Sequence, residues 1–281
     1  MLIISYRTFL LFFLCFMAMA GCARDRTGQR IAFSIEDDIR LGQQVARQVD
    51  STFRAKGQLL ERNSSEPRVQ RAYAHLDRIM NRILNSGTIA YRDEFRWESK
   101  IIDDPHTQNA FATPGGYIYV YTGLIRVLES EDHFAGVLGH EIAHADRRHS
   151  MVMLQRQYGV SLILSLLLGN NPQTVSTIAA QLAGQLAGLR FSRAAERDAD
   201  DYSVIYLAGT GHYACDGAAG FFERMLSMED RGNPPEFLST HPSPANRVQD
   251  IRAKAAVEGC KTTPASGAPF QEFKQILGLN Q

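Results

Sequence analysis

The sequence lacks an excess of charge of either sign, because its 30 Lys and Arg residues are balanced by 30 Asp and Glu residues. This balance favours neither nucleic acid as a partner nor a polybasic contact with a membrane surface. Internal repeats are also lacking. The 281 residues, of which 44% are apolar, suit one large domain or a compact core with small extensions.

The sequence also lacks an apolar run of about 20 residues, the length that a helix needs to cross a bilayer. The stretch from Phe9 to Ala20 follows a single charge at Arg7 and is typical of a signal peptide, which we expect at residues 1–21. The second stretch, Val160 to Leu168, has only nine residues. We interpret it as core packing rather than as a membrane-facing surface.

The signal peptide ends in Met-Ala-Gly-Cys, which is similar to a bacterial lipobox in which Cys22 becomes the lipidated first residue. Ordinary cleavage without lipidation is the alternative. Ala23 rather than Asp follows the cysteine, which by similarity to the Gram-negative sorting rule indicates the outer membrane. We therefore expect an outer-membrane-anchored lipoprotein on the periplasmic side of the cell envelope, or else a soluble periplasmic protein.

Cysteine is scarce, with four residues in the chain. Cys15 leaves with the signal peptide and Cys22 lies at the mature terminus, so Cys215 and Cys260 remain. In an oxidising compartment such a pair predicts a disulfide. The alternative is two unrelated buried thiols.

The most specific motif is His140-Glu141-Ile142-Ala143-His144. On a helix, residues four apart are separated by about 40° around the axis, so both imidazoles can bind one zinc ion while Glu141 reaches the ion's water. Ser130 is a suitable N-cap, and we expect this helix to run from Glu131 to Ser150. The alternative is two helix-surface histidines without a metal.

A catalytic zinc site has three protein ligands and an open position, so a third ligand is needed at a distance. Our choice is Glu196, on a helix expected from Ser192 to Ala208. Asp200 lies one turn further and can accept from the second ring N–H of a ligating histidine. A solvated acidic face paired with Arg193 and Arg197 is the alternative.

These motifs together resemble metallopeptidase family forty-eight, a gluzincin family that includes BepA, LoiP and HtpX. In chain order, the resemblance rests on Asn109–Gly116 leading into Tyr117–Tyr121, Gly123–Ile125, Gly139–His144 with Arg148-His149, Glu196–Asp200, and Thr240–Pro242 with Arg247. It implies that His140, His144 and Glu196 bind Zn²⁺, that Glu141 is the catalytic base, and that the reaction is endoproteolysis of polypeptides. We expect no tetratricopeptide domain of the kind that BepA-like members carry.

Two further elements belong to the predicted site. Tyr117–Tyr121 is β-branched and aromatic, follows a Pro-Gly-Gly turn, and reads as a strand. Beside the zinc helix, Gly116, Tyr117 and Tyr119 could pair with an extended substrate, although an ordinary sheet strand is the alternative.

His241 lies in a loop stiffened by two prolines, just before Arg247. Either residue could stabilise the oxyanion, and by resemblance His241 could instead be a removable fourth zinc ligand. The alternative is a loop histidine bonded to a backbone carbonyl. The other five histidines, among them His149, lack comparable spacing and are interpreted as surface or packing residues.

The predicted fold is α+β and mainly helical, a zincin-like catalytic domain with a small sheet whose edge strand flanks the zinc helix. We place the peptidase domain at residues 34–260, and a linker with a short amphipathic tail at 261–281. Expected helices cover 34–56, 67–84, 151–168 and 174–189, and strands cover 95–102 and 117–121.

The predicted function is zinc-dependent cleavage of unfolded or misassembled cell-envelope proteins. One alternative is a latent or chaperone-like module that binds polypeptides in the same cleft without turnover. Another is a structural zinc protein.

Overall fold

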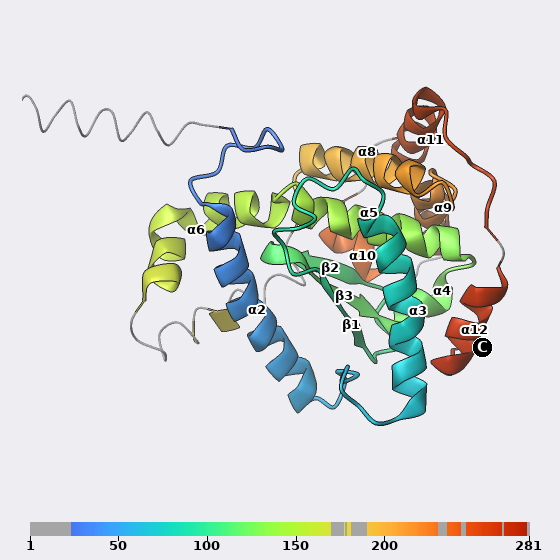
Figure 1. Cartoon of the computed structure of the whole chain (residues 1–281), viewed down its shortest axis with the longest axis horizontal. Helices are drawn as coiled ribbons and strands as arrows, with labels where there is room; N and C mark the ends of the chain where they lie inside the picture. The colour runs from blue at the N-terminus through green and yellow to red at the C-terminus, as the bar shows by residue number, and fades with distance from the viewer. Residues whose placement is uncertain are drawn as a thin grey trace, which may run out of the picture.

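The computed structural model describes residues 24–169, 177, 179–180, 190–229, 235–242, 246–265 and 267–279. The predicted signal peptide, Cys22 and most of the helix expected at 174–189 lie outside these residues. Helices surround a small sheet (Figure 1). The elements are α2 Ile35–Ala55, α3 Pro67–Leu84, β1 Glu98–Ile102, β2 Ala110–Thr113, the 3₁₀ turn η1 Pro114–Gly116, β3 Tyr117–Tyr121, α4 Thr122–Val127, α5 Glu131–Asp146, α6 His149–Leu168, α8 Arg193–Thr210, α9 Gly217–Glu229, α10 Glu236–Thr240, α11 Arg247–Glu258 and α12 Ala268–Ile276.

Helices α2 and α3 form where their sequence signals predict them. Ser34 caps α2, because its hydroxyl accepts from the backbone N–H of Asp37. The Asp37 carboxylate in turn accepts from the backbone N–H of Ser34. Pro67 occupies the first turn of α3, where its missing N–H costs nothing. Both predictions are confirmed within one residue.

The sheet has the strand order β1-β3-β2, so β3 lies in the middle and not at an edge. It pairs in parallel with β1 and antiparallel with β2, with Ala110 opposite Val120 and Thr113 opposite Tyr117. The prediction that Tyr117 and Tyr119 lie on a strand open to substrate is therefore wrong, because β3 pairs along both of its edges. The edge strand that packs against α5 is β2.

The sheet separates two cores, because alternate residues of a strand point to opposite faces. Ile118 and Val120 face the core built with α3, α5, α8 and α9. Tyr117, Tyr119 and Tyr121 face a second core formed with α2 and α6. Helix α5 runs along the first face and is buried over almost its whole length.

Helix α5 ends sooner than predicted. Its cap is as expected, with the Ser130 hydroxyl accepting from the N–H of His133. The helix stops at Asp146, and Arg148 takes the left-handed conformation at φ 58°, after which α6 begins at His149. This break turns the Arg148 guanidinium toward Asp38 and Asp25, which it bonds at 2.8 and 3.1 Å.

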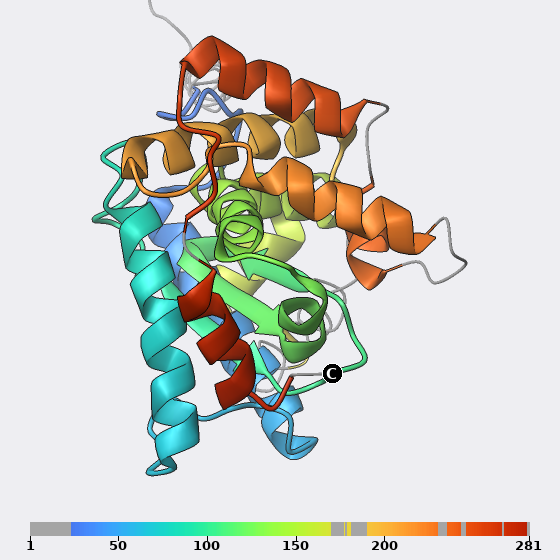
Figure 2. The ribbon, with the colours of Figure 1, turned by 90° about the vertical axis from the view of Figure 1, so that its right-hand side faces the viewer.

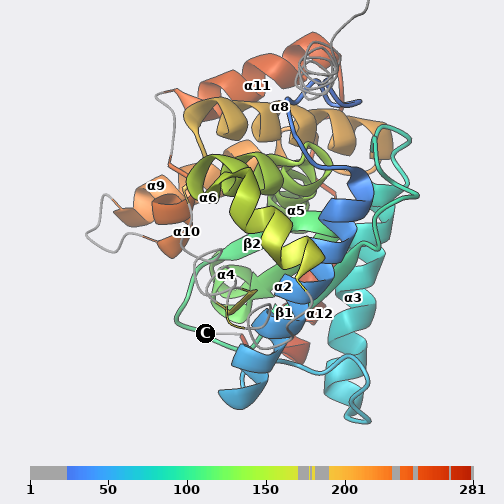
Figure 3. The same ribbon diagram turned by 90° about the vertical axis from the view of Figure 1, so that its left-hand side faces the viewer.

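Helix α6 lies beside α2 (Figure 3). Within the described part of the chain it is the one helix with the length and apolar composition of a membrane span, which by itself is weak evidence for one. Gly159, at φ 75° and ψ 161°, interrupts it. In the stretch from Val160 to Leu168, Ile163 and Leu166 are buried, whereas Val160, Leu164 and Leu168 are exposed, so the prediction of core packing holds for Ile163 and Leu166 and is wrong for the exposed residues.

The C-terminal segment is part of the main core. Helix α12 lies beside α3 (Figure 2), and Phe270 and Phe273 of α12 are fully buried against Phe134 of α5. The predicted disulfide is confirmed: Cys215, just before α9, is bonded to Cys260, just after α11.

Candidate metal centre

Four side chains from α5, α8 and the C-terminal cap of α10 meet in one cluster. His140 and His144 come from α5, Glu196 from α8, and His241 from the C-terminal end of α10. One donor atom from each lies within 4.8 Å of the others. All four side chains are at most 1% exposed. The three residues predicted as ligands are therefore brought together, with His241 beside them.

Helices α5 and α8 can approach closely because small residues face each other. A Cβ on Gly139 would lie 2.8 Å from the Ser203 hydroxyl, which donates to the Gly136 carbonyl at 2.9 Å. Ser192 caps α8 by accepting from the N–H of Ala195, as the sequence predicted. The cap places Glu196 in the first turn, facing the histidines.

A carboxylate and a guanidinium fix the outer side of His140. Nδ1 of His140 lies 2.9 Å from Asp200 Oδ1, so Asp200 bonds the outer ring nitrogen of a predicted ligand, as the sequence indicated. Arg247 donates to Asp200 at 2.7 Å and to Glu196 at 3.0 Å, and its guanidinium lies on the Phe222 ring. Arg247 thus holds two carboxylates in place.

His144 has a different outer partner. Its Nδ1 lies 3.0 Å from Nδ1 of His149, whose Nε2 lies 3.1 Å from Asp198 Oδ2. The interpretation of His149 as a mere surface or packing residue is wrong, since it is buried and bonded to a predicted ligand. The sequence could not predict this contact, because residues five apart do not share a face of a helix and because α5 ends between His144 and His149.

His241 points at the ligand cluster and away from solvent. Its Nδ1 lies 3.2 Å from Glu196 Oε1 and 3.3 Å from His140 Nε2. Its ring stacks on Phe237 with 4.1 Å between centroids. This placement differs from that of a loop histidine bonded to a carbonyl, the alternative left open by the sequence.

Glu141 is buried with both carboxylate oxygens lacking a hydrogen-bond partner among the described residues. Nε2 of His241 lies 3.5 Å from Oε1 of Glu141. Burial raises the pKa of Glu141. A buried carboxylate without a partner is costly, so its retention here indicates a chemical role.

The electrostatics of the cluster suit a cation. Burial opposes a charge on His140, yet the carboxylates of Asp200 and Glu196 raise its pKa to about 9. Burial lowers the pKa of His144 well below its usual value and so favours the neutral form that binds metals. The carboxylates of Glu141, Glu196 and Asp200 carry three formal negative charges, and the Arg247 guanidinium offsets one of them. A divalent ion would neutralise the other two. Imidazole and carboxylate donors are the ligands that zinc prefers.

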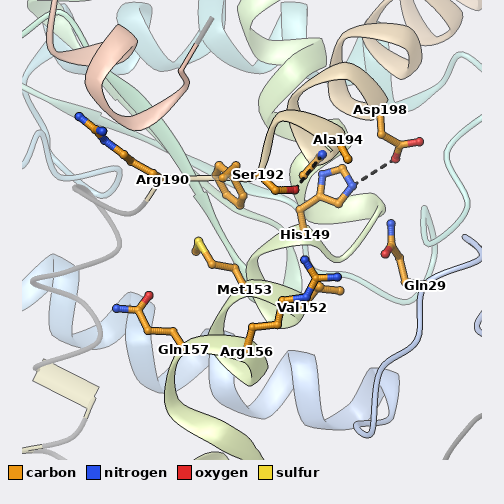
Figure 4. A pocket seen from close by; sticks show the side chains of 12 residues that line it. Gln29, His149, Val152, Met153, Arg156, Gln157, Arg190, Ser192, Ala194 and Asp198 are labelled. Atoms are coloured by element: carbon orange, nitrogen blue, oxygen red, sulfur yellow. Dashed lines mark hydrogen bonds and ion pairs between the residues drawn. The ribbon is translucent and has the colours of Figure 1, made fainter. Parts of the chain in front are cut away.

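A cavity of about 480 Å³ adjoins the cluster behind His144. Figure 4 shows His149 and Asp198 on its wall, joined by their hydrogen bond. Phe191 also lines it and stacks on His144 with 3.8 Å between ring centroids, so this ring lies between the cavity and the ligand.

The residues predicted to pair with substrate lie elsewhere. Gly116 packs against Trp97, and the Tyr117 and Tyr119 rings face the second core. The N–H of Tyr121 on β3 donates to the carbonyl of Asn109, just before β2, so the alternation of the ladder turns the backbone N–H and C=O groups of Ala110 and Ala112 away from β3. The Ala112 carbonyl accepts from Ser150 at 3.2 Å.

Comparison with known proteins gives a consistent result. A model of peptidase family M48 matches residues 70–255, about two thirds of the chain. The mitochondrial metalloendopeptidase OMA1 of Schizosaccharomyces pombe is 32% identical over 186 residues, which cover 63% of this chain and 51% of that protein. A putative beta-barrel assembly-enhancing protease of Vibrio cholerae is 36% identical over 158 residues, and the Escherichia coli protein of that name is 32% identical over 160. Each of the two bacterial matches covers 52% of this chain and 32% of the relative. The chain therefore spans about a third to a half of the length of these three relatives.

Proposed function

Because this chain belongs to peptidase family M48, we propose that it is a zinc-dependent endopeptidase acting on polypeptides. The observation that carries this proposal is the arrangement around Glu141. The buried Glu141 carboxylate, which has no hydrogen-bond partner in the described part of the chain, lies beside two imidazoles and a second carboxylate whose donor atoms converge on one point. A structural zinc site needs no such base.

In the proposed reaction, His140, His144 and Glu196 hold the zinc ion, which when bound lowers the pKa of a water molecule and polarises the scissile carbonyl. Glu141 accepts the proton of that water, since neither of its oxygens has a hydrogen-bond partner among the described residues. It then returns the proton to the leaving amine. Asp200 and Arg247 keep His140 and Glu196 oriented through the contacts described above.

We propose that an extended substrate adds to the outer edge of β2. The N–H of Ala112 and the carbonyl of Ala110 point away from β3, and main-chain hydrogen bonds to them would bind many sequences alike. This replaces the role that the sequence assigned to β3.

The position of His241 points to a closed form of the enzyme. Its Nδ1 lies as near to Glu196 and His140 as the ligands lie to one another, so it completes a four-donor set and takes the place of the water. We propose that His241 must leave before a peptide can react. If His241 instead stabilises the oxyanion, it must likewise move out of the ligand cluster first.

Replacing Glu141 with Gln tests the catalytic proposal. We expect peptidase activity on an unfolded protein to fall by about 10²- to 10⁴-fold, because only the base is lost. Zinc content should stay at one per chain. Glu129→Gln, an exposed change two residues before the start of α5, is the matched control. Cleavage by Glu141→Gln at the wild-type rate refutes the proposal.

Replacing His241 with Ala tests the closed form. We expect zinc to remain bound by three residues and the peptidase rate to rise, because the fourth position opens to water. A fall in rate with unchanged zinc binding instead supports oxyanion stabilisation by His241. If Glu141→Gln and wild type both bind an unfolded protein but neither cleaves it, even after His241→Ala, the protein-binding module is the better description.

We propose further that the substrates are unfolded or misassembled cell-envelope proteins, which agrees with the name of the bacterial relatives. The signal peptide and lipobox predicted from the sequence favour a lipoprotein anchored on the periplasmic side of the outer membrane, with a soluble periplasmic protein as the alternative. Mass spectrometry of the mature N-terminus tests this, since an unmodified peptide beginning at Gly21 excludes the lipid anchor. Proteomics of envelope fractions with wild type and Glu141→Gln would identify the substrates.

A further inference from the structure

We infer that Asp198 and His149 form a positioning dyad that sets the tautomer of His144 and so directs the lone pair of its Nε2 to the metal. The inference rests on the proposed zinc site and adds two residues to it. Neither would touch the metal or the substrate. Both act through His144.

The tautomer follows from the order of the hydrogen bonds. Asp198 as a carboxylate can only accept, so Nε2 of His149 at 3.1 Å must carry the proton. In a neutral His149, Nδ1 is then an acceptor. Because Nδ1 of His144 lies 3.0 Å from it, this nitrogen must donate. The one remaining lone pair of His144, on Nε2, points into the ligand cluster.

Asp198 is itself held in place. The Arg147 guanidinium donates to it through Nε at 2.7 Å and Nη2 at 3.3 Å, and also to the Thr27 carbonyl at 2.8 Å. The same guanidinium lies 3.9 Å from the centre of the Tyr202 ring. The Arg147 guanidinium and the His149 ring both bond the Asp198 carboxylate, and pairing with a cation favours the carboxylate form, which can only accept.

The two ligating histidines are therefore supported in different ways. His140 reaches its carboxylate, Asp200, directly, whereas His144 reaches Asp198 through an intervening imidazole. The His144 branch also forms part of the wall of the 480 Å³ cavity (Figure 4). Asp198 keeps about 30% of its side chain exposed there, so it can be changed with little disturbance of the core.

The experiment measures zinc affinity and cobalt spectra of the full mature chain. Three variants separate the contributions of His149 and Asp198 to the dyad. His149→Leu removes the acceptor for His144, His149→Asn restores an acceptor oxygen near the position of Nδ1, and Asp198→Asn keeps the shape but allows either tautomer. His75→Leu, which removes a partly buried histidine of α3 that stacks on Phe273 of α12, is the matched control.

We expect His149→Leu to weaken zinc binding by about 10- to 100-fold in competition with a chromophoric chelator. Asp198→Asn should weaken it less, and His149→Asn should stay close to wild type. The visible spectrum of the cobalt-substituted protein should change in His149→Leu and return in His149→Asn. His75→Leu should alter thermal unfolding only.

Wild-type zinc affinity and an unchanged cobalt spectrum in both His149→Leu and Asp198→Asn would overturn the dyad. If His149→Leu does not fold, Asp198→Asn alone decides, because its site is partly exposed. A lack of rescue by His149→Asn, with loss of affinity proportional to loss of stability, assigns His149 a packing role and also overturns the inference. Failure of the wild type to bind zinc refutes the metal site itself and the inference with it.

Discussion

The close crossing of α5 and α9 at Gly136 offers a quantitative test of how the metal helix is held. A Cβ at this position would lie 2.2 Å from the backbone nitrogen of Ala218, at least 1.2 Å nearer than ordinary van der Waals contact. In an open helix, Gly→Ala gains about 1 kcal/mol of helix propensity. Here the overlap is with backbone, which cannot rotate away, and overpacking typically costs about 1–3 kcal/mol or more.

The overlap also forces α5 and α9 apart, which disturbs the 2.9 Å bond from Ser203 to the Gly136 carbonyl and costs about 1 kcal/mol more. We therefore expect Gly136→Ala to lose a net ~2 kcal/mol. For a domain of this size that lowers the midpoint of thermal unfolding by about 4–8 °C. His140 lies one turn along the same helix, so zinc affinity should fall too.

Calorimetry and zinc titration of Gly136→Ala measure both effects. Gly267→Ala is the control, since Gly267 has a negative φ and no atom within 4 Å of an added Cβ. A variant at Gly136 as stable as wild type, or more stable, would mean that helix propensity outweighs packing and that α5 and α9 are not in backbone contact.

Three further outcomes are expected. Reduction of the bond between Cys215 and Cys260, or replacement of both by Ser, should lower the free energy of unfolding by about 2–4 kcal/mol in urea titrations, and an unchanged midpoint contradicts this. Burial favours a higher pKa for Glu131, but its paired bonds from Arg78 at 2.5 and 2.7 Å and from Tyr213 hold the pKa below its usual value. The stability from this carboxylate is thus present above pH 4.5 and lost as pH falls through the lowered pKa, and urea midpoints of Glu131→Gln should lack that acid-dependent loss. Removal of metal with a chelator should abolish proteolysis and lower the unfolding temperature, and one equivalent of zinc should restore both.

Local signals predicted the helices that carry the ligands. Ser130 and Ser192 each accept from a backbone N–H near the start of a helix, as their sequence context indicated. These caps set the phase of α5 and α8, and the phase decides that Glu196 faces His140 and His144. A site built from two well-capped helices is therefore largely readable from the sequence.

Strand order could not be read in the same way. β2 is the short segment Ala-Phe-Ala-Thr, and alanine has little preference for strands, so the sequence predicted the strands at 95–102 and 117–121 but not β2. The strand with the strongest β propensity was thus assigned to the edge, although it occupies the centre. Pairing with β1 and β2 depends on residues distant in sequence, which local propensity does not contain.

Asp198 and Asp200 show where spacing ceases to inform. Asp200 follows Glu196 by one turn and faces the same way, so its contact with His140 could be inferred. Asp198 is rotated by about 200° from Glu196 around α8 and looks like a solvated residue on the opposite face. It reaches the site because Arg148 adopts a left-handed conformation and ends α5, which starts α6 at His149 and places that ring between α5 and α8. The break between α5 and α6 therefore brings the His149 ring to His144. In an unbroken helix running to Ser150, as predicted, His149 would point away from His144.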